Sequence, residues 1–179
     1  MLILGIDPGS RVTGYGIVEE ANAKKRLVTA GSIQAKEAED HPARLKRIYD
    51  ALTEIIKAHE PGEIAVEMPV YGQNPQSMLK LGRAQAAAMM AGLNCDLPVN
   101  QHTPKEIKKS VTGNGNASKG QVESMVRSIL SGGKGGLSHD AYDALATALC
   151  QGGRSSHEDK SSYTGWASFV ESNPDRVSE

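Results

Sequence analysis

The sequence predicts an α/β fold built on a central mixed five-stranded sheet, with three antiparallel strands followed by two parallel ones, flanked by helices. Two patterns predict it. Residues 2–33 contain three apolar or alternating segments joined by turn residues, which is typical of an antiparallel meander. From residue 42 onward, helical patterns alternate with short apolar runs, and a strand reached through a helix pairs in parallel with an earlier strand.

Length and composition favour one domain with a tail. The 179 residues, 39% of them hydrophobic, suffice for one full core. We expect residues 1–152 to form this domain and residues 153–179 to form a mobile tail, in which residues 163–170 can make one helical turn. Apolar runs fall short of the ~20 residues that cross a membrane. Cys95 and Cys150 lack ligand-like spacing and are interpreted as free thiols, which favours a reducing, cytoplasmic location without membrane attachment.

The first three strands are expected at residues 2–6, 12–18 and 26–33, with a polar hairpin turn at residues 19–25. The apolar first segment is typical of a central strand buried on both faces, and it ends in Asp7 before a Pro-Gly turn. Alone, Asp7 could simply be a turn residue. Gly14 and Gly16 thin the second strand, and we expect a phosphate or a metal to approach the backbone there.

A helix and a parallel strand follow. After a charged loop at residues 34–41, Pro42 opens a helix with apolar residues at helical spacing, which Pro61 and Gly62 end. The next strand, residues 63–67, ends in Glu67. Because a helical crossover makes this strand parallel to the first, its end should lie at the same sheet edge, and Asp7 and Glu67 should be neighbours.

A second crossover leads through a helix at residues 75–94, capped by Asn74, to a fifth strand at residues 97–101. The helix is rich in Ala, Gly and Met. Small residues on one of its faces would allow close approach by another helix. The pattern leaves open whether that helix belongs to its own core or to a second copy of the chain.

The last part of the domain is expected to be helical, at residues 104–111, 119–130 and 138–150. The glycine-rich loop before the second of these, together with Lys119, could bind an anion or be a plain turn. Asp140 and Asp143 stand three residues apart at the start of the third, so they share one face. They could merely stabilise the helix dipole, but small residues continue that face and suit packing against a sheet.

Charge is distributed unevenly although the net charge is −1. Residues 72–134 carry 8 Lys and Arg against 3 Asp and Glu, a net of +5. This pattern suits a protein that holds a polyanion with one region and carries out metal chemistry in another. We expect DNA contacts from the following residues of this basic stretch and its start: Tyr71, Asn74, Lys80, Arg83, Lys105, Lys108, Lys109 and Lys119.

Asp7, Glu67, Asp140 and Asp143 are therefore candidate metal ligands and catalytic residues. Carboxylates are the ligands that Mg²⁺ prefers, together with waters and substrate phosphate oxygens. This set of four suits two Mg²⁺ ions per site, with Mn²⁺ expected to substitute. Two such ions promote in-line hydrolysis of a phosphodiester.

Several segments together resemble the RuvC-type Holliday-junction resolvases across essentially residues 1–152. They are LGIDPGSRVTGYGIV, the strand-end Glu67, NPQSMLKLGRAQ, GNGNASKGQV and HDAYDALATALC. The resemblance implies a ribonuclease H-like fold, places the four acids at the family's metal ligands, and makes Lys108 and Lys119 phosphate contacts. It further implies a homodimer that nicks opposing strands of a four-way DNA junction symmetrically in recombination and repair. The nicks leave 5′-phosphate and 3′-hydroxyl ends, and a RuvA–RuvB branch-migration complex would be the partner.

One position departs from the family pattern. Many members carry a base-stacking aromatic where Val70 stands, and here the nearby aromatic is Tyr71. Three rival interpretations remain: a related nuclease acting on RNA precursors, a non-catalytic junction-binding scaffold, and an ATPase of the actin or sugar-kinase type. The scaffold predicts that some acids are missing, and the ATPase requires a second lobe for which this chain is short.

Overall fold

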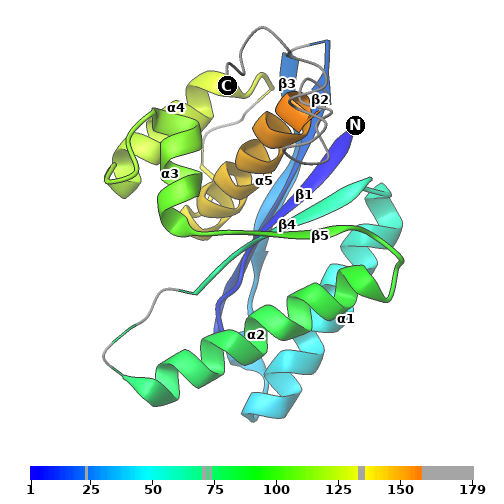
Figure 1. The fold of residues 1–179 in the computed structure, drawn as a ribbon. Coiled ribbons are helices and arrows are strands. Elements are labelled where there is room, and N and C mark those ends of the chain that lie inside the picture. Colours follow the sequence, from blue (N-terminus) through cyan, green and yellow to red (C-terminus); the bar gives the residue numbers. More distant parts are fainter. Residues whose placement is uncertain (23, 70–71, 73, 133–135, 159–179) are drawn as a thin grey trace, which may run out of the picture.

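The structure, a computed structural model, describes residues 1–22, 24–69, 72, 74–132 and 136–158 (Figure 1). Its five-stranded sheet has the order β3-β2-β1-β4-β5. The first three strands pair antiparallel, whereas β4 pairs parallel to both β1 and β5, so the predicted mixed sheet is confirmed. The strands are β1 (Leu2–Asp7), β2 (Thr13–Ala21), β3 (Lys24–Ile33), β4 (Glu63–Glu67) and β5 (Val99–His102).

Helices cover both faces of the sheet (Figure 1). One face packs against α1 (His41–His59) and α2 (Pro75–Leu93) and the other against α3 (Pro104–Thr112), α4 (Lys119–Ile129) and α5 (His139–Glu158). A short 3-10 helix, η1 (Ala35–Glu37), lies in the segment predicted as a loop. None of the described helices combines the length and apolarity that a membrane crossing requires.

Strand β1 lies at the centre of the sheet and separates two hydrophobic cores. Ile3 belongs to the core under α3, α4 and α5, while Leu4 and Ile6 belong to the core under α1 and α2. In the parallel pairing with β4, Ile6 stands opposite Val66. The next residue of each strand is an acid, so the two strands end in carboxylates at one edge, as predicted.

The glycines of β1 and β2 admit α5, not a phosphate or a metal. A Cβ on Gly14 would lie 2.0 Å from the carbonyl oxygen of Asp140, and one on Gly5 would lie 2.0 Å from that of Ala144. At Gly16 the nearest atom belongs to the side chain of Leu145, at 2.6 Å. The prediction of a ligand at these glycines was therefore wrong, because the close approach is made by the chain's own helix.

Several boundaries differ from the predictions by two residues or more, among them that of the fifth strand, which runs over Val99–His102 and not over residues 97–101. The hairpin turn predicted over residues 19–25 is shorter, because β2 extends to Ala21 and β3 begins at Lys24. Oppositely charged residues pair across these strand ends, and the Nε of Arg26 donates to Glu19 at 2.7 Å. Such cross-strand pairs stabilise polar strand segments that carry no apolar alternation.

Helix α5 continues to Glu158, past the predicted end at Cys150. Gly152 does not break it. A Cβ there would lie 2.1 Å from Oε2 of Glu20, so the glycine lets the helix remain against β2. The domain boundary at residue 152 stays a prediction, and the remaining tail, including residues 163–170, lies outside the described residues.

Substitution of Gly14 by Ala tests this packing. The added methyl group collides with the backbone of α5, so we expect the free energy of unfolding in urea to fall by roughly 2–4 kcal/mol. Gly120 is the matched control, because it lies in α4 with open space around it. Gly120→Ala should raise stability by up to about 1 kcal/mol through helix propensity. Equal stability of Gly14→Ala and the wild-type protein would contradict the close approach.

Candidate active site

A pocket of about 100 Å³ lies at the sheet edge where β1 and β4 end. Strand ends contribute two of its carboxylates, α5 contributes a third, and α3 and α4 each contribute a lysine. The lining residues are Asp7, Glu67, Pro104, Ile107, Lys108, Lys119, Val122, Asp143 and Ala146. Sequence analysis did not single out the apolar members of this set, which helical periodicity identifies only as core positions.

Local sequence signals fix the helices that carry these side chains. Thr103 begins α3 with a capping box, in which its hydroxyl accepts from the backbone of Glu106 while the Glu106 carboxylate accepts from the backbone of Thr103. Ser118 and Gln121 form the same arrangement at the start of α4. This cap uses the N–H of Gln121, so the glycine-rich loop leaves fewer free donors for an anion than its sequence indicates. Both caps hold a lysine-bearing helix at a defined position.

The strand-end acids resist ionisation. Burial, followed by the charges of Asp7 and Asp143, raises the pKa of Glu67 from its ordinary 4.5 to about 8. Burial, followed by the charge of Asp143, raises the pKa of Asp7 from 3.8 to about 6, and Asp140 adds to this effect. Asp140 does not line the pocket, yet it lies close enough to Asp7 to act on it. The four predicted acids thus form one electrostatic group.

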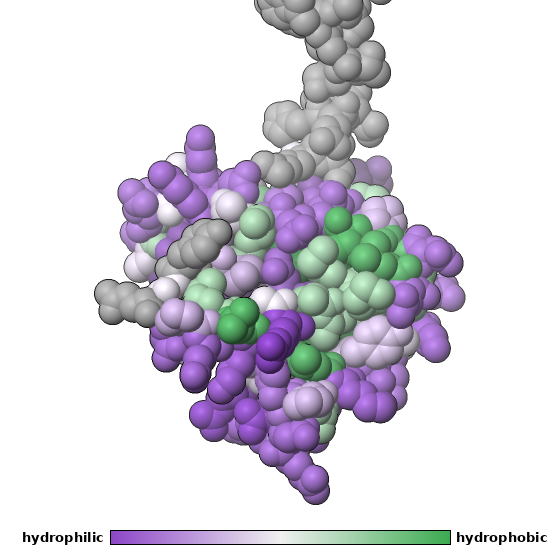
Figure 2. Space-filling model, turned by 60° about the horizontal axis from the view of Figure 1, so that its bottom comes forward, coloured by the Kyte–Doolittle hydropathy of each residue, from purple (hydrophilic) through white to green (hydrophobic). Residues whose placement is uncertain are grey.

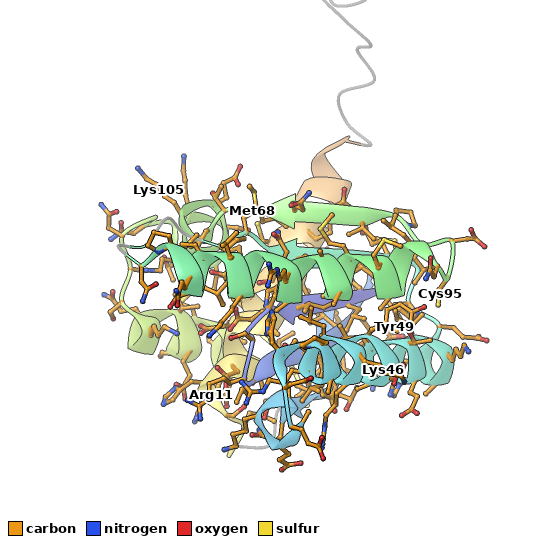
Figure 3. The ribbon with its side chains drawn as sticks, turned by 90° about the horizontal axis from the view of Figure 1, so that it is seen from below. Arg11, Lys46, Tyr49, Met68, Cys95 and Lys105 are labelled. Atoms are coloured by element: carbon orange, nitrogen blue, oxygen red, sulfur yellow. The ribbon has the colours of Figure 1, made fainter. Side chains whose placement is uncertain are left out.

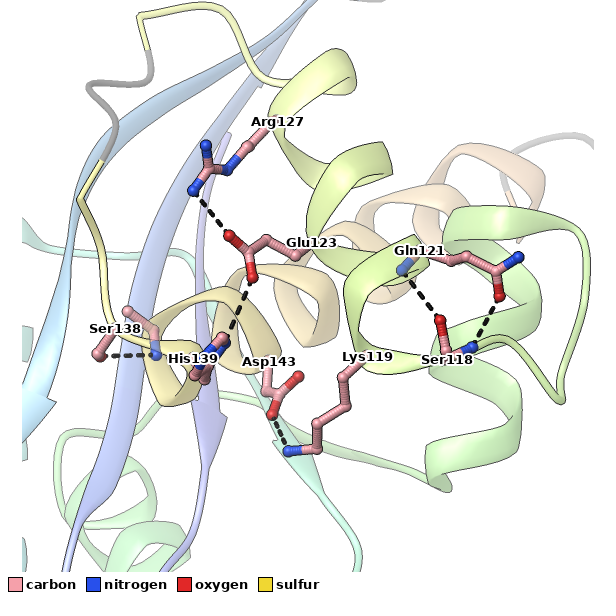
Figure 4. Close-up of polar contacts among 9 residues, drawn as sticks. Ser118, Lys119, Gln121, Glu123, Arg127, Ser138, His139 and Asp143 are labelled. Carbon is pink, nitrogen blue, oxygen red and sulfur yellow. Dashed lines mark hydrogen bonds and ion pairs between the residues drawn. The ribbon is translucent and has the colours of Figure 1, made fainter.

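Lys119 partly neutralises this group. Its Nζ donates to Oδ2 of Asp143 at 2.7 Å (Figure 4), and this hydrogen bond raises the pKa of the lysine. Lys108 lies on the opposite helix of the pocket and lowers the pKa of Glu67 by its charge. Two lysines therefore face an excess of carboxylates, which is the electrostatic condition for binding a further cation.

A second polar cluster joins α4 to the start of α5 beside the pocket (Figure 4). Glu123 accepts from Nη2 of Arg127 at 2.7 Å and lies 3.3 Å from Nδ1 of His139. The Arg127 guanidinium in turn stacks 4.9 Å from the centre of the Tyr142 ring. The sequence did not predict this cluster. The i, i+4 spacing of Glu123 and Arg127 signalled one of its pairs, but the contacts to α5 depend on the tertiary fold.

The site is not a closed metal cage as it stands. Among the described residues, no three His, Cys, Asp or Glu side chains are arranged to hold an ion together. The ammonium group of Lys119 instead takes one carboxylate. The acids of the site nonetheless offer carboxylate oxygens, and burial together with neighbouring negative charge raises the pKa values of Asp7 and Glu67, which a bound cation would lower again. This donor set fits a hard divalent cation that keeps waters and substrate oxygens among its ligands.

The other predicted DNA contacts fall into separate groups. Lys105, which lies on α3, lines a neighbouring, mostly apolar pocket. Lys109 is exposed on the same helix. Lys80 and Arg83 are exposed on α2, which covers the other face of the sheet. The structure thus brings only Lys108 and Lys119 of the predicted lysines into the carboxylate pocket.

The remaining two predicted contacts are different in kind. The side-chain oxygen of Asn74 accepts from the backbone N–H groups of Gln76 and Ser77, at 3.0 and 3.2 Å, so it caps α2. Tyr71 lies outside the described residues, as does Val70. A role of Tyr71 in base stacking stays a prediction.

A mixed sheet in this order, with acids at the adjacent ends of β1 and β4 and a helix that adds further acids, defines a ribonuclease H-like domain of the nuclease class. The model of the family "Crossover junction endodeoxyribonuclease RuvC" matches residues 3–151. The chain belongs to this family, whose members are metal-dependent nucleases.

Individual relatives agree with this assignment. The crossover junction endodeoxyribonuclease RuvC of Salinibacter ruber is 67% identical to this chain, with 100% of both chains covered. The solved structure of Thermus thermophilus RuvC in complex with a Holliday junction substrate superposes with a TM-score of 0.80 at 30% identity, covering 87% of this chain and 94% of that chain. The yeast mitochondrial Holliday junction resolvase Ydc2 shares the fold, with a TM-score of 0.65 at 15% identity and coverage of 88% and 82%.

Substitution of Glu67 by Gln should stabilise the metal-free protein at neutral and alkaline pH. Because the folded-state pKa is raised, ionised Glu67 costs stability as pH rises from about 4.5 through about 8. In EDTA, the stability gained by Glu67→Gln should be close to zero at pH 4.5 and reach on the order of 2 kcal/mol at pH 8, or roughly 4–8 °C in Tm. Thermal unfolding of the variant and the wild-type protein across this pH range measures the difference in Tm.

Glu19→Gln provides the control, because Glu19 forms an exposed ion pair with Arg26. Such pairs contribute at most about 1 kcal/mol, so its effect should stay small throughout. A gain from Glu67→Gln that does not change with pH would contradict the assigned cause.

Proposed function

We propose that this chain is a structure-selective endonuclease that resolves four-way DNA junctions by hydrolysing phosphodiesters in opposing strands, leaving 5′-phosphate and 3′-hydroxyl ends. The observation that carries the proposal is the meeting of half-buried carboxylates and two lysines in one pocket. Membership of the RuvC family and the similarity to a RuvC bound to a Holliday junction support the choice of substrate. The setting would be recombination and repair of DNA in the cytoplasm.

Asp7, Glu67, Asp140 and Asp143 would together hold two Mg²⁺ ions, with Mn²⁺ as a substitute. When bound, the two ions would activate water for in-line attack and stabilise the leaving 3′ oxygen. The carboxylates must be ionised to act as ligands, so the raised pKa values of Asp7 and Glu67 would fall on loading and protons would be released. Asp7 and Glu67 each end a buried β-strand, and these strands would keep the two metal ligands in place.

Lys119 would act on the scissile phosphate. In the free protein it is paired with Asp143, and its side chain is 73% exposed, so it can reorient without repacking the core. When Asp143 binds a metal ion, the ammonium group of Lys119 would lose this partner and become free to contact the substrate phosphate. Lys108, from the facing helix, would contact the same or the neighbouring phosphate, which places the backbone between two helices.

We also propose a homodimer formed through α2. Five of its exposed residues follow a spacing of four and three, which is the spacing of a helix-to-helix seam. They are Leu79, Arg83, Ala86, Met90 and Leu93. Leu79 is 61% exposed and Leu93 is 48% exposed, which is costly for a surface in water. Figure 2 shows hydrophobic residues gathered on the face that carries this helix. Gly82 on the same helix has open space around it, so a second helix could approach closely.

A two-fold dimer would place two identical sites on one junction, as paired cuts require. By family resemblance, a RuvA–RuvB branch-migration complex would be the further partner.

A synthetic four-way junction tests the proposed function. The wild-type protein should cut it in Mg²⁺ and not in EDTA, and should leave linear duplex and structured RNA intact. Asp7→Asn should bind the junction normally but cut it at least roughly 100-fold more slowly, because a ligand is lost. Gel assays of binding and single-turnover cleavage separate the two effects. Preferred cutting of RNA would favour the RNA nuclease, and cleavage-free binding by the wild-type protein would favour the scaffold.

Met90→Asp tests the dimer. A carboxylate at the centre of the α2 stripe would be buried on association, so sedimentation should show a single chain of 19.0 kDa where the wild-type protein sediments as a pair. Met125→Asp is the matched control, because Met125 is a comparably exposed methionine on α4. The control should remain dimeric. A dimer that survives Met90→Asp would assign the interface to another face.

A further inference from the structure

A chain of buried polar side chains lies between the sheet and α5, and the proposed mechanism does not use it. The side-chain amide of Gln151 on α5 donates through Nε2 to Oε2 of Glu63 on β4 at 2.7 Å, and its Oε1 lies 2.8 Å from Nε2 of His102 on β5. Asn100 donates to the same oxygen of Glu63 at 3.2 Å. Glu63, His102 and Gln151 are all buried. One amide therefore joins three elements of the fold.

The directions of these hydrogen bonds follow from one another. Because the amide NH₂ of Gln151 donates to Glu63, the oxygen of the same amide faces His102, and an amide oxygen can only accept. Nε2 of His102 therefore donates. A buried polar group that loses such a partner destabilises the fold, so each member of the chain holds the next in one orientation.

The apolar contact of α5 with the sheet restrains the helix less strictly. Gly5 of β1 lies directly against the backbone of Ala144 and the side chain of Ala148. Burial of apolar surface is not directional, and no long side chain interlocks where glycine meets alanine. A hydrogen bond, in contrast, weakens steeply when its donor and acceptor are misaligned. The amide of Gln151 can therefore fix the rotation of α5 and its position along the helix axis.

Gln151 lies on the same face of α5 as Asp143. Asp143, Thr147 and Gln151 follow a spacing of four residues, which places them along one stripe, and Thr147 is fully buried. At one end of this stripe Asp143 lines the catalytic pocket, and Gln151 lies about two turns further along the helix. Rotation of α5 would move both side chains together. The contacts of Gln151 thus control the direction from which Asp143 enters the pocket.

The other end of the chain reaches the strands beside the pocket. His102 pairs with Glu67 across β4 and β5, and the N–H of Met68 donates to the carbonyl of His102 at 2.8 Å. Helix α3, which carries Lys105 and Lys108, begins two residues after His102. Figure 3 shows Met68 and Lys105 on the same side of the molecule. His102 therefore connects Gln151 to the strand pair that holds Glu67.

We propose that Gln151 is a positioning residue for the metal site. By holding α5 to β4 and β5, it sets the position of Asp143 relative to Glu67. This inference rests on the proposed binding of divalent cations by these acids. Gln151 would not touch the ion, so its effect is carried by geometry alone. A small divalent cation accepts a narrow range of ligand positions, and a displaced carboxylate binds it more weakly.

Gln151→Met tests the inference, because methionine keeps a long side chain and lacks the amide. Mn²⁺ binding without DNA, measured from the electron paramagnetic resonance signal of the free ion, should weaken by roughly 3- to 30-fold, as expected for a residue that acts through others. Added Mn²⁺ should also raise the Tm of this variant less than that of the wild-type protein, since stabilisation follows affinity. Where Gln151→Met does not fold, Gln151→Asn replaces it, because its amide is too short to reach both partners.

Two control variants separate position from charge and from loss of stability. Glu63→Gln removes a negative charge and keeps an oxygen that accepts from Gln151, so it should bind Mn²⁺ as tightly as the wild-type protein does. Ile48→Ala removes a buried side chain from the core under α1 and α2, on the other face of the sheet. It should lower the Tm and leave Mn²⁺ affinity unchanged.

Equal Mn²⁺ affinity of the wild-type protein and a folded Gln151 variant would overturn the inference. A similar loss of affinity in Ile48→Ala would also overturn it, because lowered stability would then be the cause. If Glu63→Gln weakens binding as much as Gln151→Met does, charge and not position is responsible, and the inference fails. If the wild-type protein binds no Mn²⁺, the proposed metal site itself fails.

Discussion

The parallel pairing of β1 with β4 is the constraint on which the site depends. It places Ile6 opposite Val66 in the buried sheet, so the next residue of each strand, Asp7 or Glu67, must emerge at the same edge. Neither acid can move away without breaking a central strand pairing. The cost of holding two carboxylates together, with little water, is visible in their raised pKa values. The same crowding that destabilises the free protein provides the attraction for a cation.

The third carboxylate of the pocket, Asp143, reaches the site because glycines in the sheet lack side chains. Gly5, Gly14 and Gly16 remove the atoms that would keep α5 away from the sheet. The helix contributes small buried residues to this contact, Ala144 and Ala148 among them. Its first turn therefore reaches the edge where β1 and β4 end, and it brings Asp143 into the pocket. Backbone packing thus brings the acids to one edge, and the Nζ of Lys119 then donates to Asp143 there.

Much of this arrangement could be predicted from local sequence. An apolar run that ends in an acid, repeated after a helical crossover, was enough to place Asp7 and Glu67 at one edge. The spacing of Asp140 and Asp143 was enough to put them on one helix face. The partner of Gly14 could not be predicted, because a glycine shows that something approaches closely without showing what. A ligand was predicted there, and a helix far along the chain is what the structure contains.

Contacts between distant helices were likewise beyond sequence analysis. Lys119 was expected to meet a phosphate, and in the free protein it meets Asp143 instead. The pocket that Lys105 lines joins the segment after β4 to the loop before α4, and no periodicity in the sequence connects these two segments. The extended end of α5 depends on how Gly152 fits against Glu20. In each case the sequence specifies the residue type, and only the fold specifies its neighbour.

The two faces of the sheet present different surface features that lie close together along the chain. The face under α3, α4 and α5 contributes the pocket, whereas α2 on the other face presents an exposed apolar stripe. Only residues 68–74 separate the end of β4 from the start of α2. A pair of chains joined through α2 would therefore fix the distance between its two Glu67 carboxylates by a rigid helix and a short connection. Geometry of this kind would select a substrate by the separation of its two cleavable strands.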